Sequence, residues 1–327
     1  MPEGPPEPDR KALAAWLSQC GFEPRAGQRL SGDVSPRRYE RWTAVDGRTA
    51  ILALYPQEVR PACARFARTT ALLATASVRV PAILAADCAR GWMLLEDLGE
   101  VTLGDLRQRP WNELAAWFAD AAGIAGRIAH LPHGLAADLN PPLDGALMTR
   151  ELAQTREIFL VPRGLASATL DAALAALVDA LAGDPAVPCH RDLMARNLMP
   201  LPPHQAGRVA VLDHQDLRLG PPAYDMASLL NDTLFAPPDL EERLVEAALP
   251  GPANRLRYHR AATQRTLKAV GTYAAFARRG AERHLPLIAP TLRSFLRHFG
   301  KTPEGSALAP DLEARWQDAL TDGPRRS

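Results

Sequence analysis

Lysine is scarce in this chain of 327 residues, in which only Lys11, Lys268 and Lys301 stand among 38 basic residues. The net charge is +1, so there is no overall attraction to nucleic acids or acidic membranes. No apolar run approaches the length of a membrane span, and the Pro-rich, acidic start resembles neither a signal peptide nor an anchor. We therefore expect no nucleic-acid or membrane partner. We also expect a cytoplasmic monomer.

Cysteine is also rare. It occurs at four positions (20, 63, 88 and 189), without the C-x-x-C spacing of many redox and metal sites. No second His or Cys lies at metal spacing from His190, which argues against zinc. This usage is typical of a reducing compartment and predicts a fold without disulfide bonds.

Two short segments carry the strongest chemical signal. Residues 189–197 read C-H-R-D-L-M-A-R-N, and V-L-D-H-Q-D follows at 211–216. Phosphoryl transfer from ATP uses one Asp to accept the proton of the attacking hydroxyl, and an Asn with a second Asp to hold magnesium. The spacing H-x-D-x-x-x-x-N with an Asp about twenty residues later matches the kinase catalytic loop and metal Asp. We assign Asp192 as the base, and Asn197 and Asp213 as magnesium ligands.

These segments and G-P-P-A-Y-D-M-A-S-L-L-N-D at 220–232 resemble the aminoglycoside phosphotransferase and choline kinase superfamily. Within it, the sequence most resembles the bacterial anomeric kinases that phosphorylate N-acetylmuramate and N-acetylglucosamine in cell-wall recycling. The segments at 31–39, 80–87 and 94–99 support that closer resemblance, which runs from about residue 25 to residue 300. It implies an enzyme that uses ATP and Mg²⁺ to phosphorylate an amino sugar.

The resemblance implies an α+β, bilobal protein-kinase-like fold, with which the order of elements agrees. A small β-sheet N-lobe is expected at 1–98 and a larger, mainly helical C-lobe at 99–327. Strands are expected at 28–32, 38–45, 49–54, 83–86 and 92–96, with a hairpin turn at Asp46 and Gly47, and the apolar run 209–212 before Asp213 is expected to form a further short strand. The first helices are expected at 11–20 and 58–76. Further helices are expected at 111–130, 149–158, 168–182, 225–234, 239–248, 254–279, 286–299 and 311–320.

Nucleotide-binding residues are expected at two places in the N-lobe. A turn after the first strand would present backbone N–H groups and a hydroxyl to the phosphates. The stretch L-L-E-D-L-G stands where the family has its hinge, whose backbone binds the adenine edge. The assigned residues are Gly32, Asp33, Val34, Ser35, Arg38, Glu96, Asp97 and Leu98.

One kinase residue is missing from the third strand. That strand reads A-I-L-A-L-Y-P at 50–56, without the lysine that usually pairs with the phosphates. Arg37 and Arg38 are the candidate substitutes, and the alternative for each is that it merely coats the strand.

Acceptor residues are expected around the catalytic loop. Arg191 and Arg196 lie beside the base, and a guanidinium binds a carboxylate such as the lactyl group of N-acetylmuramate. Asp216 is a candidate for a second metal position or a sugar hydroxyl, and a plain turn role is equally open. The two arginines of the helix expected at 149–158 reach the substrate or form structural salt bridges. Asp225 is expected to cap a helix and to anchor the catalytic loop.

Two alternatives stay open. A kinase for aminoglycosides, choline or homoserine would share every catalytic residue, although the mixed charges of the helices at 239–248 and 254–279 do not favour a cationic acceptor. A nucleotide-binding pseudokinase would explain the missing lysine. The intact Asp192, Asn197 and Asp213 argue against it.

Overall fold

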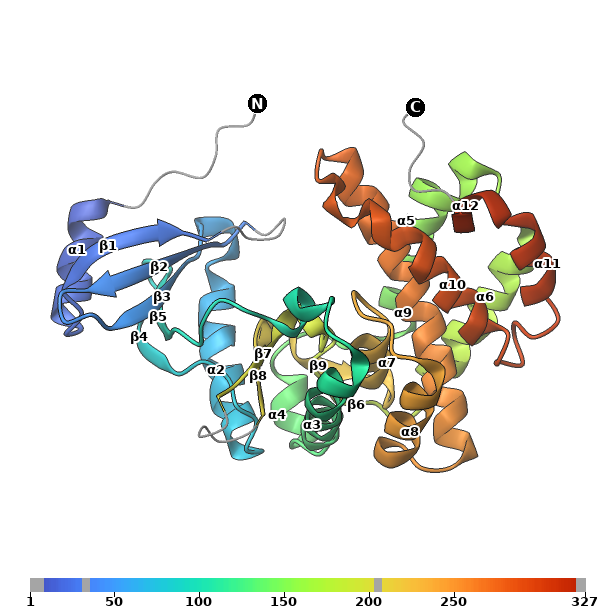
Figure 1. Ribbon diagram of the computed structural model, residues 1–327, viewed down its shortest axis with the longest axis horizontal. Coiled ribbons are helices and arrows are strands. Elements are labelled where there is room, and N and C mark those ends of the chain that lie inside the picture. Colours follow the sequence, from blue (N-terminus) through green and yellow to red (C-terminus); the bar gives the residue numbers. More distant parts are fainter. Residues whose placement is uncertain (1–8, 31–35, 203–207, 322–327) are drawn as a thin grey trace. The chain divides into compact units, whose positions relative to one another are not determined.

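The computed structural model describes residues 9–30, 36–202 and 208–321 (Figure 1). It contains two compact units, the first made of Met1–Glu100 with Ala210–Gln215 and the second of the remaining residues. The first unit therefore takes in a segment that chain order alone placed in the C-lobe. The predicted α+β class is confirmed, because an antiparallel sheet is followed by a mainly helical region.

The first unit is built on a five-stranded antiparallel sheet with the order β1-β2-β3-β5-β4. Its strands are β1 (Pro24–Arg29), β2 (Arg38–Ala44), β3 (Thr49–Leu54), β4 (Ile83–Asp87) and β5 (Trp92–Glu96). The predicted turn at Asp46 and Gly47 joins β2 to β3, and Gly47 adopts the left-handed conformation that such turns favour.

The first strand begins four residues earlier than the sequence predicts. Gly27 of β1 lies opposite Trp42 of β2, and a Cβ atom on Gly27 would come within 2.7 Å of the indole. The glycine therefore leaves the space that the aromatic ring occupies on the neighbouring strand. Glycine usually weakens a strand, which explains why the predicted start lay after Gly27.

Both faces of the sheet are covered because β3 and β5 are apolar on both sides. Alternate residues of β3 pack with α1 (Arg10–Gln19) in one cluster, and the residues between them pack with α2 (Pro61–Thr75) in another. This follows from the period of two along a strand. Buried members on the α1 side include Leu13, Leu17, Leu52 and Leu94, and those on the α2 side include Ala53, Phe66, Met93 and Leu95.

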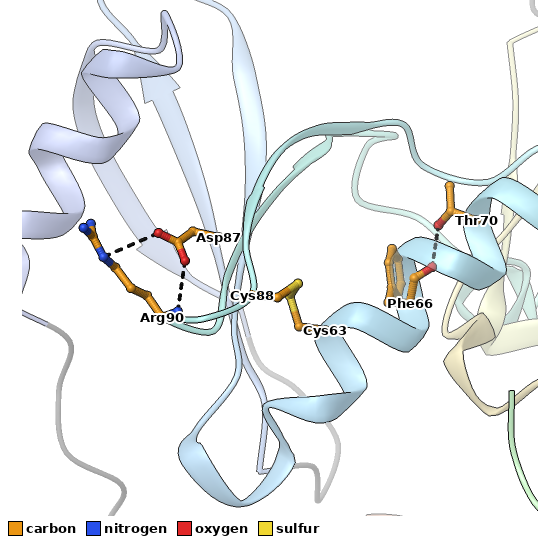
Figure 2. The surroundings of a disulfide bond; sticks show 6 residues. All are labelled: Cys63, Phe66, Thr70, Asp87, Cys88 and Arg90. Atoms are coloured by element: carbon orange, nitrogen blue, oxygen red, sulfur yellow. Dashed lines mark hydrogen bonds and ion pairs between the residues drawn. A yellow bond between two sulfur atoms is a disulfide. The ribbon is translucent and has the colours of Figure 1, made fainter.

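A disulfide bond joins Cys63 of α2 to Cys88, which directly follows β4 (Figure 2). Their Cα atoms lie 5.5 Å apart, an ordinary separation for a disulfide. The prediction of a fold without disulfide bonds is therefore wrong. The two cysteines are 25 residues apart in sequence and meet only because α2 packs against the sheet, so no short spacing signals them. Cys20 and Cys189 are free thiols.

The second unit is mainly helical, and its longest helix, α9 (Pro252–Arg278), packs against five other α-helices of the described residues. Those neighbours are α5 (Gly145–Thr155), α6 (Ala168–Ala182), α7 (Tyr224–Leu230), α8 (Pro238–Ala248) and α10 (Ile288–Phe299). Its remaining α-helices are α3 (Trp111–Ala129), α4 (His133–Ala137), α11 (Ala309–Arg315) and α12 (Gln317–Thr321). In the described ranges, no helix combines the length and the apolar character needed to cross a membrane.

Close packing of α5 on α9 depends on Gly271. A Cβ atom there would lie 2.1 Å from the Thr155 hydroxyl oxygen, which donates to the backbone carbonyl of Leu267 at 3.1 Å. Asp144 begins α5 by accepting a hydrogen bond from the backbone N–H of Leu147, so the helix starts four residues before the predicted position. The close approach at Gly271 positions the face of α5 that carries Glu151.

Short strands lie on either side of the motif residues. β6 (Val187–Cys189) pairs antiparallel with β9 (Arg218–Gly220), and the catalytic loop starts directly after β6. The other two short strands are β7 (Leu198–Pro200) and β8 (Val209–Val211). β8 is the apolar run expected before Asp213, and it ends one residue earlier than predicted.

Loss of the disulfide is expected to lower the free energy of unfolding of the first unit by about 3 kcal/mol, because the bond restricts the unfolded chain. The measurement is urea denaturation of Cys88→Ser under non-reducing conditions, since Cys88 is half-buried and tolerates serine better than the buried Cys63. Cys20→Ser is the matched control, because it removes an exposed free thiol. Identical midpoints for both variants and the parent protein would contradict a disulfide in the folded state.

Candidate active site

The catalytic loop is anchored to α7 by its backbone. The Asp225 carboxylate accepts hydrogen bonds from the backbone N–H groups of His190 at 2.7 Å and Arg191 at 2.8 Å. The Ser228 hydroxyl donates to the Arg191 carbonyl at 2.8 Å. Arg191 has a φ of +74°, a left-handed conformation that is unfavourable for a residue with a side chain. These three bonds hold the strained turn that presents Asp192.

Asp225 performs only one of its two predicted roles. It anchors the loop, but α7 begins after Ala223 without a side-chain cap, so the predicted capping role is wrong. Asp225 lies in the first turn of α7 and is buried. Burial raises the pKa of its carboxyl group, and the charge of His190 and the two backbone donors oppose that change.

Asp192 is a partly buried carboxylate among cations. Its side chain is 22% exposed, and Oδ1 lies 3.6 Å from Nη2 of the buried Arg265 on α9. Burial by itself would raise the pKa of Asp192, but the charges of Lys268, Arg191 and Arg265 outweigh it and hold the pKa well below the usual range. Asp192 is therefore ionised at neutral pH, as a proton acceptor must be.

Asn197 is held by the same loop. Its Nδ2 donates to the backbone carbonyl of Asp192 at 2.8 Å, which commits the N–H₂ end of the amide to the protein. The side-chain oxygen is then the end available to a ligand. An amide oxygen is a suitable donor for magnesium, so the residue fits its predicted role.

Arg191 is already engaged by carboxylates of the second unit. Nη2 lies 2.7 Å from Oε1 of Glu151 on α5, and Nη1 lies 3.9 Å from Oδ2 of Asp216. Gln264 of α9 donates to the other Glu151 oxygen at 3.1 Å. Asp216 also lies 3.6 Å from Nη2 of Arg218 and ends a short 3₁₀ turn. The substrate roles of Arg191 and Asp216 stay predictions.

Arg196 shares an acidic partner with Arg265. Its Nη2 lies 3.7 Å from Oδ1 of the buried Asp232, and Nη2 of Arg265 lies 3.5 Å from the same oxygen. Tyr273 donates to that oxygen at 3.1 Å. A substrate role for Arg196 also stays a prediction.

Four residues that surround Asp192 and its neighbours were missed by the sequence analysis, namely Glu151, Asp232, Arg265 and Lys268. The arginines predicted to reach the substrate were Arg150, on α5, and Arg156, which directly follows α5. Arg150 is exposed, and Arg156 forms the alternative structural salt bridge, with its Nε 3.0 Å from Asp171 Oδ2. The one available signal was helical spacing, which places Met148, Glu151 and Thr155 on one face.

In the first unit, Asp213 contacts Arg37. Nη2 of Arg37 lies 2.7 Å from Oδ1 of Asp213, and Gln215 donates to the same oxygen at 2.9 Å. The Asp213 side chain is 40% exposed, whereas Arg37 is 13% exposed. Of the two candidate substitutes for the strand lysine, the structure thus brings Arg37 to the predicted metal carboxylate. Arg38 begins β2 and pairs in register with Leu54 of β3.

The segment that carries Asp213 is fixed to α2 by His214. Its buried ring packs on Phe66 with the ring centres 4.1 Å apart, and its Nε2 lies 2.8 Å from the Thr70 hydroxyl. Figure 2 shows Phe66 and Thr70 on the helix that also carries Cys63. Asp213 itself has a φ of +56°. Its backbone is therefore in the left-handed conformation, as that of Arg191 is, and is strained.

The two acidic side chains of the predicted hinge form ion pairs with arginines of the first unit. Glu96, at the end of β5, forms an ion pair with Arg79. Asp97 binds Arg41 through two bonds of 2.7 and 3.0 Å. Both carboxylates are therefore bound to arginines of the same unit. Adenine binding here stays a prediction, and the predicted phosphate-binding residues Gly32, Asp33, Val34 and Ser35 lie outside the described residues.

A model of the phosphotransferase enzyme family (APH) matches residues 26–262 of this chain. The chain belongs to this phosphotransferase family. It is 32% identical over 299 residues to the N-acetylmuramate/N-acetylglucosamine kinase of Pseudomonas putida, with 85% of each chain covered. It is also 32% identical over 312 residues to the kinase of the same name from Pseudomonas aeruginosa, with 88% of each chain covered. The predicted resemblance and the phosphotransferase class are confirmed.

Solved structures of other phosphotransferases share the fold. Choline kinase LicA from Streptococcus pneumoniae matches with a TM-score of 0.61 at 14% identity, covering 93% of this chain and 98% of its own. The ADP-bound aminoglycoside phosphotransferase APH(2'')-Ib matches with a TM-score of 0.57 at 15% identity, covering 88% and 97%. At such low identity the similarity establishes the fold alone.

Asp225→Ala is expected to lower the free energy of unfolding of this phosphotransferase by about 2–4 kcal/mol, because two backbone donors lose their acceptor. Thermal or urea unfolding measures the change. Asp138→Ala is the matched control, since Asp138 is an exposed carboxylate in the same unit. A midpoint unchanged from that of the control would contradict the anchoring role.

Proposed function

We propose that this phosphotransferase is an ATP-dependent kinase that phosphorylates the anomeric hydroxyl of N-acetylmuramate, N-acetylglucosamine or both, in peptidoglycan recycling. The observation that carries the proposal is the ionised carboxylate of Asp192, held on a kinase-type loop. The choice of acceptor is supported by the names of the relatives, which are kinases of these two sugars. We retain a cytoplasmic monomer as part of the proposal.

Asp192 acts as the general base. Its carboxylate accepts the proton of the sugar hydroxyl as the hydroxyl oxygen attacks the γ-phosphorus and the bond to ADP breaks. An anomeric hydroxyl is more acidic than an ordinary alcohol, so a carboxylate base is adequate. Arg265 and Lys268 hold the carboxylate in its ionised form before the sugar binds.

The residues proposed for the nucleotide site are assigned from the family motif and from the contacts that each makes within its own unit. Asn197 and Asp213 would hold a magnesium ion, which would neutralise charge on the phosphate oxygens. Asn197 offers its amide oxygen and Asp213 its carboxylate, and they remain the predicted ligands. Arg37, next to Asp213, is our candidate for the missing strand lysine. A solved structure of this fold with bound ADP supports an adenine nucleotide as the phosphoryl donor.

The test is ADP release from the purified protein with Mg-ATP and one of four acceptors: N-acetylmuramate, N-acetylglucosamine, choline or kanamycin. We expect turnover with the N-acetyl sugars and an acid-labile sugar 1-phosphate as product. Asp192→Asn should lower that turnover about a thousandfold or more while nucleotide binding is retained. Asp171→Asn, which alters only a surface ion pair with Arg156, should retain activity.

Other outcomes separate the alternatives. Turnover of choline or kanamycin alone would preserve the mechanism and reject the sugar. No turnover with any acceptor would favour a pseudokinase or an acceptor of another class. Near-normal activity of Asp192→Asn would show that another group is the base.

A further inference from the structure

Lys268 lies on α9 within one helical turn of two residues that contact the carboxylates of the site. Gln264, four residues earlier, donates to Glu151 at 3.1 Å, and Arg265, three residues earlier, lies 3.6 Å from Asp192. Residues three and four apart share one face of a helix, so Lys268 belongs to the same face. Burial by itself would raise the pKa of both Glu151 and Asp192, but nearby charges, of which that of Lys268 is the largest, lower both pKa values below their usual range.

Among the described residues, the Lys268 ammonium has no ion-pair partner, unlike the cations next to it. Arg191 is bound to Glu151 at 2.7 Å, and Arg265 lies 3.6 Å from one carboxylate and 3.5 Å from another. Within the described part of the chain, no carboxylate oxygen forms an ion pair with Lys268. Lys268 is half-buried, so part of its surface is open to solvent.

We propose that Lys268 is a specificity-determining residue whose ammonium receives a carboxylate of the acceptor while Asp192 engages the acceptor's hydroxyl. This inference rests on the proposed function and narrows it to anionic amino sugars as preferred acceptors. N-acetylmuramate carries a lactyl carboxylate that N-acetylglucosamine lacks, so only the former gains this contact. Lys268 then takes the role in carboxylate recognition that was predicted for Arg191 and Arg196, which are already held by acidic side chains.

The lysine is well suited to this role. Burial and the charges of Arg265 on its own helix and Arg191 on the catalytic loop favour the neutral amine, while Asp192 and Glu151 favour the ammonium, which leaves the pKa of Lys268 at about 8. A partly desolvated ammonium without a bonded counter-charge gains more from an incoming carboxylate than a solvated one does. Its flexible stem also lets the charge adjust to the ligand, which a rigid guanidinium fork does less readily.

The test compares kcat/KM for N-acetylmuramate with kcat/KM for N-acetylglucosamine in the parent protein and in Lys268→Met. Loss of the charge-assisted contact should lower the ratio about tenfold or more. An effect that acts only through Asp192 falls on both sugars and leaves the ratio unchanged, so the ratio isolates acceptor recognition. Lys268→Arg keeps the charge and should retain part of the preference.

Lys301→Met is the matched control. Lys301 lies 3.6 Å from Glu242 and follows α10, away from these residues in the sequence, and its loss should leave the ratio unchanged. An unchanged ratio in Lys268→Met, or a parent protein that turns over only N-acetylglucosamine, would overturn this inference while the proposed function stands. A parent protein that turns over neither sugar would overturn both.

The parent protein also allows a test without mutation, should Lys268→Met fail to fold. The ammonium predominates at pH 7 and is lost as the pH rises through about 8, whereas the lactyl carboxylate stays ionised throughout. The preference for N-acetylmuramate should therefore be largest near pH 7 and decline above pH 8. A ratio that stays constant up to pH 9.5 would contradict the role of Lys268.

Discussion

The second unit depends on keeping one partly buried carboxylate charged. Desolvation favours a neutral Asp192, and a neutral carboxyl group cannot accept a proton. The protein opposes this effect with three cations from two places: Arg191 on the loop, and Arg265 and Lys268 on α9. Glu151 forms an ion pair with Arg191, and Asp232 forms one with Arg265. Of the three cations, only Lys268 forms no ion pair with a described residue. Gly271 contributes indirectly, because it allows the approach of α5 that positions Glu151.

In the first unit, the Asp213 carboxylate is held in place by different contacts. The strained backbone of this residue is held by His214 against α2, and its carboxylate is held by Arg37 and Gln215. The disulfide ties α2 to the strand pair β4–β5 one helical turn before Phe66. The helix that supports the predicted metal residue is therefore covalently fixed to the sheet.

Local patterns predicted most of the fold, and non-local contacts account for what they missed. Apolar runs on β3 and β5, the Asp46–Gly47 turn and the periodicity of the long helices gave the element order, because each signal lies within a few residues. The kinase motif predicted Asp192 as the base for the same reason, because its residues are also close in sequence. The contributions of Arg265 and Lys268 arise from helix packing across more than 70 residues of sequence, as the separation of Arg265 from Asp192 shows, and a polar residue on a helix gives no sign of its partner. The pairing of Cys63 with Cys88 was missed likewise, because it depends on how α2 packs against the sheet.

The acid side of the pH–rate profile tests most directly whether cations keep the base ionised. The quantity is kcat/KM for N-acetylglucosamine at saturating Mg-ATP between pH 7 and pH 5, with folding checked at each pH. N-acetylglucosamine is the suitable acceptor because it carries no carboxylate of its own. A pKa of Asp192 held below the ordinary value of about 3.9 predicts a level profile across this range. A fall with a midpoint at or above pH 5 would show that burial outweighs the cations and would contradict the account.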